Sequence, residues 1–467
     1  MEMETIKLIF DIIGYFFILY LIGYSTFLFL SVVVGATTLY KKKMQDRLMN
    51  KFTDNYFVPI SIIVPAYNEE VTVVETVKSL LMLEYNLYEI VVVDDGSKDT
   101  TSQKLIDAYN MHPVKRPLHR SINCKSEEFI YETHSCKVPI TLIRKKNGGK
   151  ADALNMGINA AKYPYFICMD ADSVLQYDSL KKIVIPLLEE DNVVAVGGTV
   201  RPSNDVELCD GKVKKYRIPK KILACMQLLE YDRSFLASRI LFDQFNGSLI
   251  ISGAFGMFKK ETVIAAGGYD HGTMGEDMEL VVKLHSYCLG NKIPYSIKYA
   301  TDAVCWTQVP EKLGDLKKQR KRWHLGLFQT MWKHKVMLAN PKFKSVGVVS
   351  YIYFLLYELL SPFIEVFGVF SMIVAFLLDL LNLPFMVLFI LIYAVYNSIL
   401  TLTAFFSRIQ TIDLTVTFHD SLKAIMLCFF EVTTLRFIMA FVRLMAFKGY
   451  KKKKLDWGRI ERKKINI

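Results

Sequence analysis

Residues 166–175 read FICMDADSVL, an apolar run that ends in two carboxylates, Asp170 and Asp172. In an extended chain, residues i and i+2 face the same side, so both side chains can reach one point. Two convergent carboxylates repel each other unless they hold a cation, and hard oxygen ligands suit Mg²⁺ or Mn²⁺ together with substrate phosphates. The stretch predicts a buried strand that ends at a metal-bound diphosphate. In the alternative interpretation, one aspartate caps the next helix and the other is solvated.

The chain around this stretch alternates between strand and helix patterns. Strands are predicted at residues 60–64 and 89–93, in ITLIRKK (140–146) and in YFICMD (165–170), with helical patterns after each of the first three. Such alternation predicts a parallel sheet with helices on both faces, whose ligands bind beyond the carboxyl ends of the strands. Acidic residues follow the strands at those ends: Glu69, Asp94, Asp95, Asp170 and Asp172.

The turn NGGK, residues 147–150, lies between the third strand and its helix. Gly148 and Gly149 allow the backbone to approach a ligand closely, and Lys150 supplies a point charge suited to a phosphate. The turn lacks the G-x-x-x-x-G-K-S/T spacing of a P-loop, so that interpretation fails. Asp152, just beyond it, has a structural interpretation as the cap of the following helix.

The apolar residues, 52% of the chain, are concentrated at its two ends. Residues 8–40 carry no charge apart from Asp11, and residues 346–447 are again dominated by Leu, Phe, Ile and Val, so both regions are long enough to span a bilayer. Residues 41–344 have the composition of a soluble domain. Lys41, Lys42 and Lys43 follow the first span directly, which predicts a retained anchor with the central domain in the cytoplasm of a multi-pass plasma-membrane protein.

Charge and cysteine content argue against several other classes of protein. The net charge of +12 comes from basic residues beside apolar spans, so anionic lipid headgroups are a simpler partner than nucleic acid. The eight cysteines form no paired C-x-x-C, which fits a reduced compartment. The spacing of a polar cluster matches no regular zinc site; its members are His112, His119, Cys124, His134 and Cys136.

Seven motifs follow one another between residues 58 and 330: PAYNEE, VVVDDGSKD, NGGKADALN, DADS, SGAFGMF, GED and QRKRW. In this order they resemble the membrane-embedded inverting family 2 glycosyltransferases, which include the cellulose, hyaluronan, poly-N-acetylglucosamine and mixed-linkage β-glucan synthases. The resemblance implies an α/β, Rossmann-like GT-A domain in the cytoplasm, joined to transmembrane and interfacial helices. It also implies a UDP-sugar bound through Mg²⁺ or Mn²⁺.

The resemblance assigns donor-binding and catalytic residues. Ala66, Tyr67 and Glu69 would contact the uridine, and Asp95 the base or the ribose. The diphosphate and its metal would be met by Lys150, Arg322, Asp170 and Asp172. Asp277, after Glu276, matches the position of the catalytic base, although this chain reads Gly-Glu-Asp where many cellulose-type synthases have Thr-Glu-Asp. In the alternative interpretation, these two acids have only a structural role, a favourable contact with a helix N-terminus.

Acceptor contacts are assigned to the motif QRKRW and to SGAFGMF. Gln319 and Trp323 would meet the acceptor sugar, with Ser252 and Gly253 as a less direct correspondence. The alternative for QRKRW is a basic interfacial helix with Trp323 at the headgroups. Both can hold, because Gln319 and Trp323 lie four apart on one helix face.

Five regions are predicted: a transmembrane helix (1–40), the GT-A domain (41–310), interfacial helices (311–345), channel-forming transmembrane and interfacial helices (346–447) and a basic cytoplasmic tail (448–467). Residues 346–381 should form a proline-kinked helix whose Glu358 and Glu365 face a polar lumen. A second span should follow at 385–406. The last block, 422–447, should be interfacial or re-entrant, because a full crossing would place the final lysines outside.

The resemblance implies a processive inverting synthase that secretes a β-glycan. A mixed-linkage or cellulose-like β-glucan made from UDP-glucose is favoured, and a poly-N-acetylglucosamine or hyaluronan-type product made from UDP-N-acetylglucosamine is the alternative. A non-processive enzyme that glycosylates a lipid is a rival, but an aromatic platform suits a site that re-binds a lengthening chain. A transporter with a degenerate domain would have lost acids from the motifs, and all are present. No pattern indicates an oligomeric state.

Overall fold

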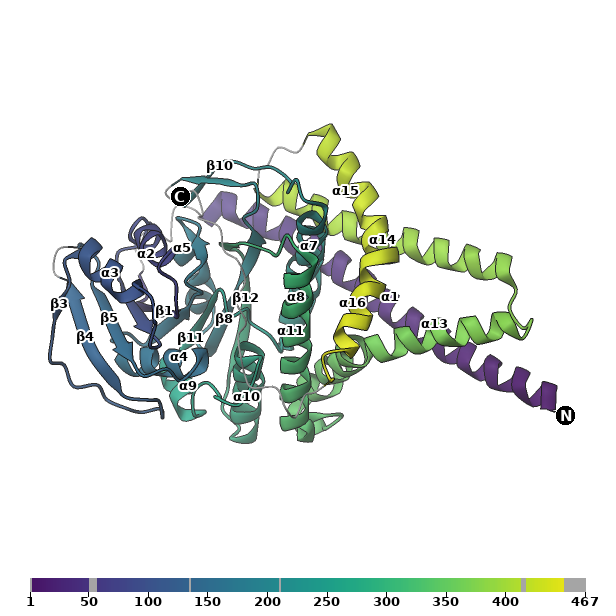
Figure 1. Cartoon of the computed structure of the whole chain (residues 1–467), viewed down its shortest axis with the longest axis horizontal. Coiled ribbons are helices and arrows are strands. Elements are labelled where there is room, and N and C mark those ends of the chain that lie inside the picture. Colours follow the sequence, from purple (N-terminus) through teal and green to yellow (C-terminus); the bar gives the residue numbers. More distant parts are fainter. Residues whose placement is uncertain (1, 50–56, 134–135, 210, 413–416, 449–467) are drawn as a thin grey trace.

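The computed structural model describes residues 2–49, 57–133, 136–209, 211–412 and 417–448. Within these ranges an α/β domain lies at one end of the molecule, and long helices extend away from it at the other (Figure 1). Of the basic tail predicted for 448–467, Lys448 alone belongs to the described part, so the Lys451 to Lys454 run lies outside it.

A mixed sheet of ten strands organises the α/β domain over the described residues. Its order is β3-β4-β5-β2-β1-β6-β11-β8-β12-β7. The strands are β1 (Ile60–Ala66), β2 (Tyr88–Asp94), β3 (His112–Pro113), β4 (Glu127–Thr133), β5 (Ile140–Lys145), β6 (Tyr165–Cys168), β7 (Ser173–Leu175), β8 (Val193–Pro202), β11 (Gly256–Lys259) and β12 (Ser296–Thr307). A separate hairpin joins β9 (Glu207–Cys209) to β10 (Lys212–Lys215).

The four predicted strands form the parallel centre of this sheet, in the order β5-β2-β1-β6. β1, β2 and β5 are rich in Ile or Val, whereas β6 reads YFIC. All four are buried along nearly their whole length, as expected where helices cover both faces. Beyond these four strands the sheet is mixed, however. β11 runs antiparallel to both β6 and β8, and β4 runs antiparallel to β5. The segment between β2 and β5, for which no strand was predicted, supplies β3 and β4.

Helices connect the strands and cover the sheet. They are α2 (Val73–Leu81), α3 (Thr101–Tyr109), α4 (Lys150–Ala160), α5 (Ser179–Ile183), α6 (Ile185–Glu189), α9 (Lys260–Ala265) and α10 (Glu276–Gly290). Every residue of α4 after Lys150 is buried, and Gly157 allows its close approach to β1. A Cβ atom at Gly157 would lie 2.3 Å from Cγ2 of Ile63. This packing fixes the start of α4, which carries Lys150, against the carboxyl edge of the sheet.

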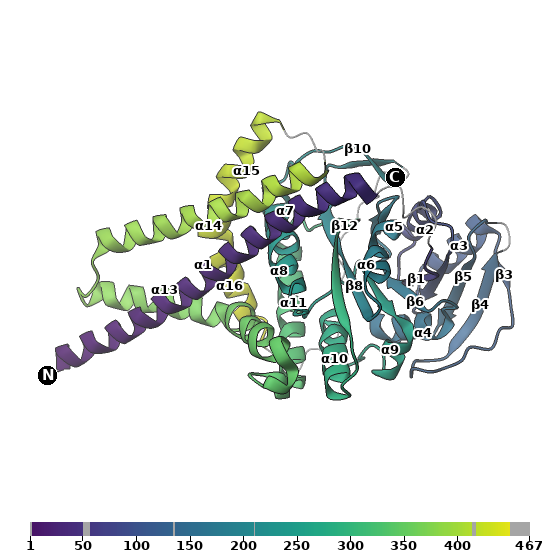
Figure 2. The ribbon, with the colours of Figure 1, turned by 180° about the vertical axis from the view of Figure 1, so that it is seen from behind.

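Between the sheet and the long apolar helices lies a layer formed by α7 (Ile222–Arg233), a π-helical turn (Ser234–Ser238), α8 (Arg239–Asp243) and α11 (Leu313–Lys333). The remaining helices are α1 (Glu2–Met49), α12 (Tyr351–Tyr353), α13 (Ser361–Leu377), α14 (Leu383–Ile412), α15 (Phe418–Phe430) and α16 (Arg436–Leu444). Figure 2 shows α1 running from the far end of the apolar helices, beside α13 and α14, to the near side of the α/β domain. There, Nζ of Lys42 lies 2.5 Å from Oδ1 of Asp302 on β12.

Three helices among the described residues are long and apolar enough to cross a membrane: Glu4–Met44, Met386–Ser407 and Phe418–Leu444. The first two match the predicted spans. The predicted kink is also present, because Val346–Leu359 and Ser361–Leu377 meet at 47°, with Pro362 in the first turn of α13. In Figure 1, α15 and α16 run across the direction of α1, α13 and α14 rather than along it. By length and composition this block could also cross a membrane, so the interfacial or re-entrant placement predicted for it remains a prediction.

Candidate active site

The carboxyl ends of the central strands open into one cavity of about 2140 Å³. Every residue assigned to the site from the sequence lines it: Ala66, Tyr67, Glu69, Asp95, Lys150, Asp170, Asp172, Ser252, Gly253, Glu276, Asp277, Gln319, Arg322 and Trp323. These residues come from positions up to 257 apart in the chain, 66 to 323. The structure therefore brings the acids together at one edge of the sheet, as predicted.

Asp94 and Asp95, at the end of β2, hold the backbone of neighbouring turns in place. Asp94 is buried and accepts hydrogen bonds from the Ser97 amide (2.8 Å) and the Ser102 hydroxyl. Asp95 accepts from the amides of Gly148 (2.9 Å) and Gly149 (2.7 Å) in the NGGK turn. Gly149 has a φ of 92°, a conformation that favours glycine. Asp95 therefore shapes the wall of the cavity in addition to lining it, and a contact with the nucleotide remains a prediction.

Lys145 is a buried cation behind this turn that the sequence did not single out. Its Nζ lies 2.6 Å from Oδ1 of Asp95 and 2.5 Å from Oδ1 of Asp152. The expectation that Asp152 caps α4 is wrong: Gly149 is the N-cap and no side chain caps the helix. The Asp152 carboxylate instead binds Lys145 and the Lys125 amide, since it is needed to neutralise a fully buried ammonium group.

Replacing Lys145 by Met is expected to destabilise the protein by on the order of 3–5 kcal/mol, because two buried carboxylates lose their cation. Thermal unfolding of the detergent-solubilised protein should show a clearly lower melting temperature. Lys318→Met is the matched control, since Lys318 is 63% exposed and pairs with Asp315 at the surface. A Lys145→Met protein that melts together with wild type and the control would contradict this role.

Lys150 stands between the strand-end acids and the start of α10. Its Nζ lies 2.5 Å from Oδ1 of Asp170 and 3.2 Å from Oε1 of Glu276. Burial disfavours the charged amine, but Asp170 and Glu276 outweigh burial and raise the pKa of Lys150, which stays protonated. Burial raises the pKa of Glu276, and the nearby Lys150 charge partly offsets this rise. The cavity thus holds a fixed positive charge where a phosphate could bind.

Asp170 and Asp172 supply the two carboxylates predicted to hold a metal ion. Burial, reinforced by the neighbouring Asp170 carboxylate, raises the pKa of Asp172. A divalent cation would relieve this concentration of negative charge. Within the described ranges, no three His, Cys, Asp or Glu side chains converge on a single point. Two carboxylates nevertheless fit Mg²⁺ or Mn²⁺, since Mg²⁺ commonly takes one or two protein carboxylates and completes its shell with water and phosphate.

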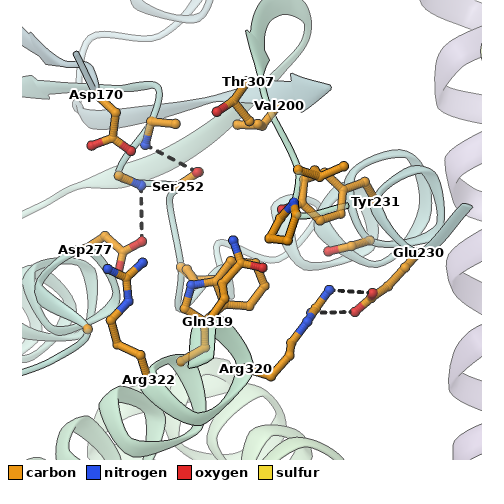
Figure 3. Close-up of a pocket in the computed structure, with 18 of the residues that line it drawn as sticks. Asp170, Val200, Glu230, Tyr231, Ser252, Asp277, Thr307, Gln319, Arg320 and Arg322 are labelled. Carbon is orange, nitrogen blue, oxygen red and sulfur yellow. Dashed lines mark hydrogen bonds and ion pairs between the residues drawn. The ribbon is translucent and has the colours of Figure 1, made fainter. Parts of the chain in front are cut away.

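The predicted base, Asp277, is held at the start of α10. Its Oδ2 accepts a hydrogen bond from the Gly253 amide (3.1 Å) and its Oδ1 from the Met278 amide (2.8 Å). A Cβ atom at Gly253 would lie 3.4 Å from both Cβ of Asp277 and Nζ of Lys150. Figure 3 shows Arg322 reaching toward Asp277 from α11, with Ser252 and Asp170 on the opposite side. Residues predicted to bind the donor and residues predicted to bind the acceptor therefore meet around Asp277.

The QRKRW motif presents its side chains to the same cavity. Trp323 is 40% exposed, and Oε1 of Gln319 is buried without a hydrogen-bond partner among the described residues. The guanidinium of Arg320 lies 4.6 Å from the centroid of the Trp323 ring and makes two 2.7 Å hydrogen bonds to Glu230 (Figure 3). Arg320 thus packs against the Trp323 ring and is itself held by Glu230. Sequence reasoning missed this role because Glu230 is 90 positions away.

The family model described as "Glycosyltransferase like family 2" matches residues 58–326, more than half of the chain. The chain belongs to glycosyltransferase family 2. It is 29% identical over 348 residues to a poly-β-1,6-N-acetyl-D-glucosamine synthase of Staphylococcus epidermidis, covering 72% of this chain and 74% of that protein. The enzyme of the same name from Staphylococcus aureus is 28% identical over 348 residues, with the same shares covered.

A solved structure shares the fold of this family 2 chain. It is the mannosyltransferase PcManGT from Pyrobaculum calidifontis, in complex with GDP-Man and Mn²⁺. The TM-score is 0.50 at 19% sequence identity, and the match covers 84% of this chain and 98% of that one. This likeness confirms the predicted GT-A architecture.

The glycosyltransferase cavity continues past α11 into the layer of apolar helices. Glu358 and Glu365 both line it, as predicted for acids that face a polar lumen. Charged pairs also line this part: Arg233 makes hydrogen bonds of 3.0 and 3.3 Å to Glu431, and Nε of Arg436 lies 2.9 Å from Oε1 of Glu365. The predicted site residues and these charged pairs among the apolar helices thus line one continuous cavity.

The possible zinc cluster does not form over the part of the chain that the structure describes, because no three suitable ligands meet there. Cys124 instead accepts a hydrogen bond from Asn159. His134 lies outside the described residues.

Proposed function

We propose that this family 2 glycosyltransferase is a processive synthase that transfers N-acetylglucosamine from UDP-N-acetylglucosamine to a growing β-linked polysaccharide. The observation that carries the proposal is the single cavity that joins the paired aspartates, the predicted base, the Trp323 platform and the polar positions among the apolar helices. The choice of sugar follows the relatives, both named poly-β-1,6-N-acetyl-D-glucosamine synthases. They do not support the β-glucan product from UDP-glucose favoured by the sequence, so the alternative sugar replaces it.

In the proposed reaction, Asp277 is the general base. It accepts the proton of the acceptor hydroxyl while that oxygen attacks the anomeric carbon of the donor. The new bond to carbon forms on the face opposite the departing UDP oxygen, so an α-linked donor yields a β-glycoside and no covalent enzyme intermediate is needed. The Gly253 and Met278 amides hold the carboxylate in place for this step.

Cationic groups stabilise the leaving diphosphate. Lys150 and Arg322 supply fixed positive charge at the donor side of the cavity, which is most favourable when charge grows on the departing oxygen. Asp170 and Asp172 would hold Mg²⁺ or Mn²⁺, which when bound neutralises diphosphate charge. Trp323 and the unpaired Gln319 oxygen suit an acceptor sugar, through ring stacking and a hydrogen bond from a hydroxyl.

The membrane arrangement in this proposal follows the sequence prediction. α1, the kinked pair and α14 cross the bilayer, α15 and α16 lie near its cytoplasmic surface, and the α/β domain faces the cytoplasm. Lys42 supports this orientation, because the basic end of α1 contacts the α/β domain directly through Asp302. The product would leave through the continuation of the cavity past Glu358 and Glu365.

A donor screen tests the proposed sugar. Purified protein in lipid nanodiscs is incubated with UDP-N-acetylglucosamine, UDP-glucose, UDP-glucuronic acid or GDP-mannose, with Mg²⁺ or Mn²⁺, and nucleotide release is measured. UDP-N-acetylglucosamine is expected to give the highest kcat/KM. Preference for UDP-glucose would contradict the proposed sugar but not the transfer chemistry.

A further inference from the structure

One face of α11 runs beside the loop that leads into the catalytic acids. Arg322, Gly326, Gln329 and Lys333 are spaced four, three and four residues apart, so they share this face. The contacting segment comprises loop residues 270–275 and the first two residues of α10. It runs in the opposite direction to α11: Asp277 lies beside Arg322, and Asp270 pairs with Lys333. The helix that carries the acceptor platform is thus attached along its length to the segment that carries the base.

The backbones of α11 and of this segment come very close together at two glycines, Gly326 and Gly275. A Cβ atom at Gly326 would lie 2.7 Å from both Cα and N of Gly275, and one at Gly275 would lie 3.1 Å from Cα of Gly326. A side chain at Gly326 would require the backbone to move, and one at Gly275 would require its neighbour to shift by a few tenths of an ångström.

Gln329, one turn beyond Gly326, hydrogen-bonds to the loop itself. Its Oε1 accepts from the Met274 amide at 2.8 Å and from the Thr273 hydroxyl at 3.3 Å. Thr273 in turn accepts from the Gly275 amide at 3.2 Å. A single amide oxygen therefore orients two of the residues that precede Glu276 and Asp277.

Lys333 completes the contact at the far end. It pairs with Asp270 and lies 2.7 Å from Oε1 of Glu279, a fully buried carboxylate in the first turn of α10. His334 lies 3.2 Å from the same oxygen, and Lys283 lies 3.1 Å from Oε2. These bonds restrain both sides of Asp277, the loop before it and the helix turn after it.

We infer that Gln329 and Gly326 are positioning residues, which set the distance between the base Asp277 and the acceptor bound at Trp323. This inference rests on the proposed transfer reaction. Neither residue needs to touch substrate. Loss of the Gln329 contacts should leave donor binding largely intact, because Asp95, Lys150 and Asp172 belong to other elements. Arg322, the donor-side residue on α11, lies two helical turns away from Gln329. The chemical step should slow, since a misplacement of about 1 Å can cost roughly 100-fold in rate.

The test compares Gln329→Ala with Gln329→Glu, whose carboxylate can still accept both hydrogen bonds. Gln329→Ala is expected to lower kcat for UDP release roughly 10- to 100-fold with the donor KM within about twofold of wild type. Gln329→Glu should restore kcat to within about threefold. Gln103→Ala, an exposed glutamine on α3 that bonds Asp107, is the matched control and should behave as wild type.

Gly326→Ala should show the same split between kcat and KM, and melting temperatures identify any variant that fails to fold. The inference is overturned if folded Gln329→Ala keeps the wild-type kcat, if its loss appears in KM instead, or if Gln329→Glu is equally impaired. Failure of the proposed function is a separate result, because wild-type protein would then release no nucleotide with any donor.

Discussion

Asp277→Asn is expected to lower the rate of sugar transfer roughly 10²- to 10⁴-fold, the usual contribution of a positioned general base. The substitution keeps the shape of the side chain, and the amide oxygen can still accept a hydrogen bond from Gly253. It removes the basic oxygen that takes the acceptor proton. Donor affinity should stay near wild type, because no step of donor binding uses that proton. Single-turnover transfer of radiolabelled sugar, with UDP affinity measured in parallel, separates the two effects.

Asp107→Asn is the matched control for this substitution. Asp107 is an exposed aspartate on α3 whose described hydrogen bond is to Gln103. It should transfer sugar at the wild-type rate. If Asp277→Asn protein is folded, binds UDP and still transfers at full speed, Asp277 is not the base.

Asp172→Ala is expected to lower kcat/KM roughly 10²- to 10³-fold, because the developing diphosphate charge loses part of its electrostatic stabilisation. The loss should depend on the metal. Wild-type protein should bind UDP more tightly as Mn²⁺ is added and weakly in EDTA, whereas the variant should show little response to Mn²⁺. Calorimetric titration of UDP at several Mn²⁺ concentrations measures this coupling directly.

Asp191→Ala provides the comparison, since Asp191 is an exposed aspartate in the turn before β8. Its response to Mn²⁺ should match that of wild type. A Mn²⁺-dependent gain in UDP affinity that survives in Asp172→Ala would mean that this carboxylate does not hold the cation.

The central strands could be predicted because their information is local. β1, β2, β5 and β6 are short runs rich in β-branched or aromatic residues, each followed closely by polar turn residues, and such runs suit a sheet buried on both faces. The direction of β11 could not be predicted in this way. Its pairing with β6 joins residues about 90 positions apart, and the register depends on how the intervening helices pack.

The site was predictable to the extent that strand ends meet at one edge of a sheet. This argument brings Asp95, Asp170 and Asp172 together without knowledge of the loops. It does not predict the role of Lys145, which in the sequence is one of two lysines at the end of a strand. Nor does it predict that the Asp152 carboxylate neutralises Lys145. Both roles depend on burial, which arises only when α4 packs on the sheet.

The contacts of α11 also could not be predicted from local sequence. The motif QRKRW indicates Gln319, Arg322 and Trp323, but Arg320 acquires its role from Glu230 on α7. Gln329 carries no local signal, because its partners lie about 55 positions earlier in the chain. Side chains that position a site from a distance are set by tertiary packing, so a pattern in one segment cannot identify them.

The size of the product tests the central claim most directly. Purified protein in nanodiscs is supplied with radiolabelled UDP-N-acetylglucosamine and Mg²⁺ or Mn²⁺, and the product is separated by length at low donor conversion. Long β-linked chains that coexist with unused acceptor are predicted, since each chain should stay bound in the cavity over many additions. A glycolipid that carries one sugar, or no transferred sugar from any donor, would contradict a processive synthase.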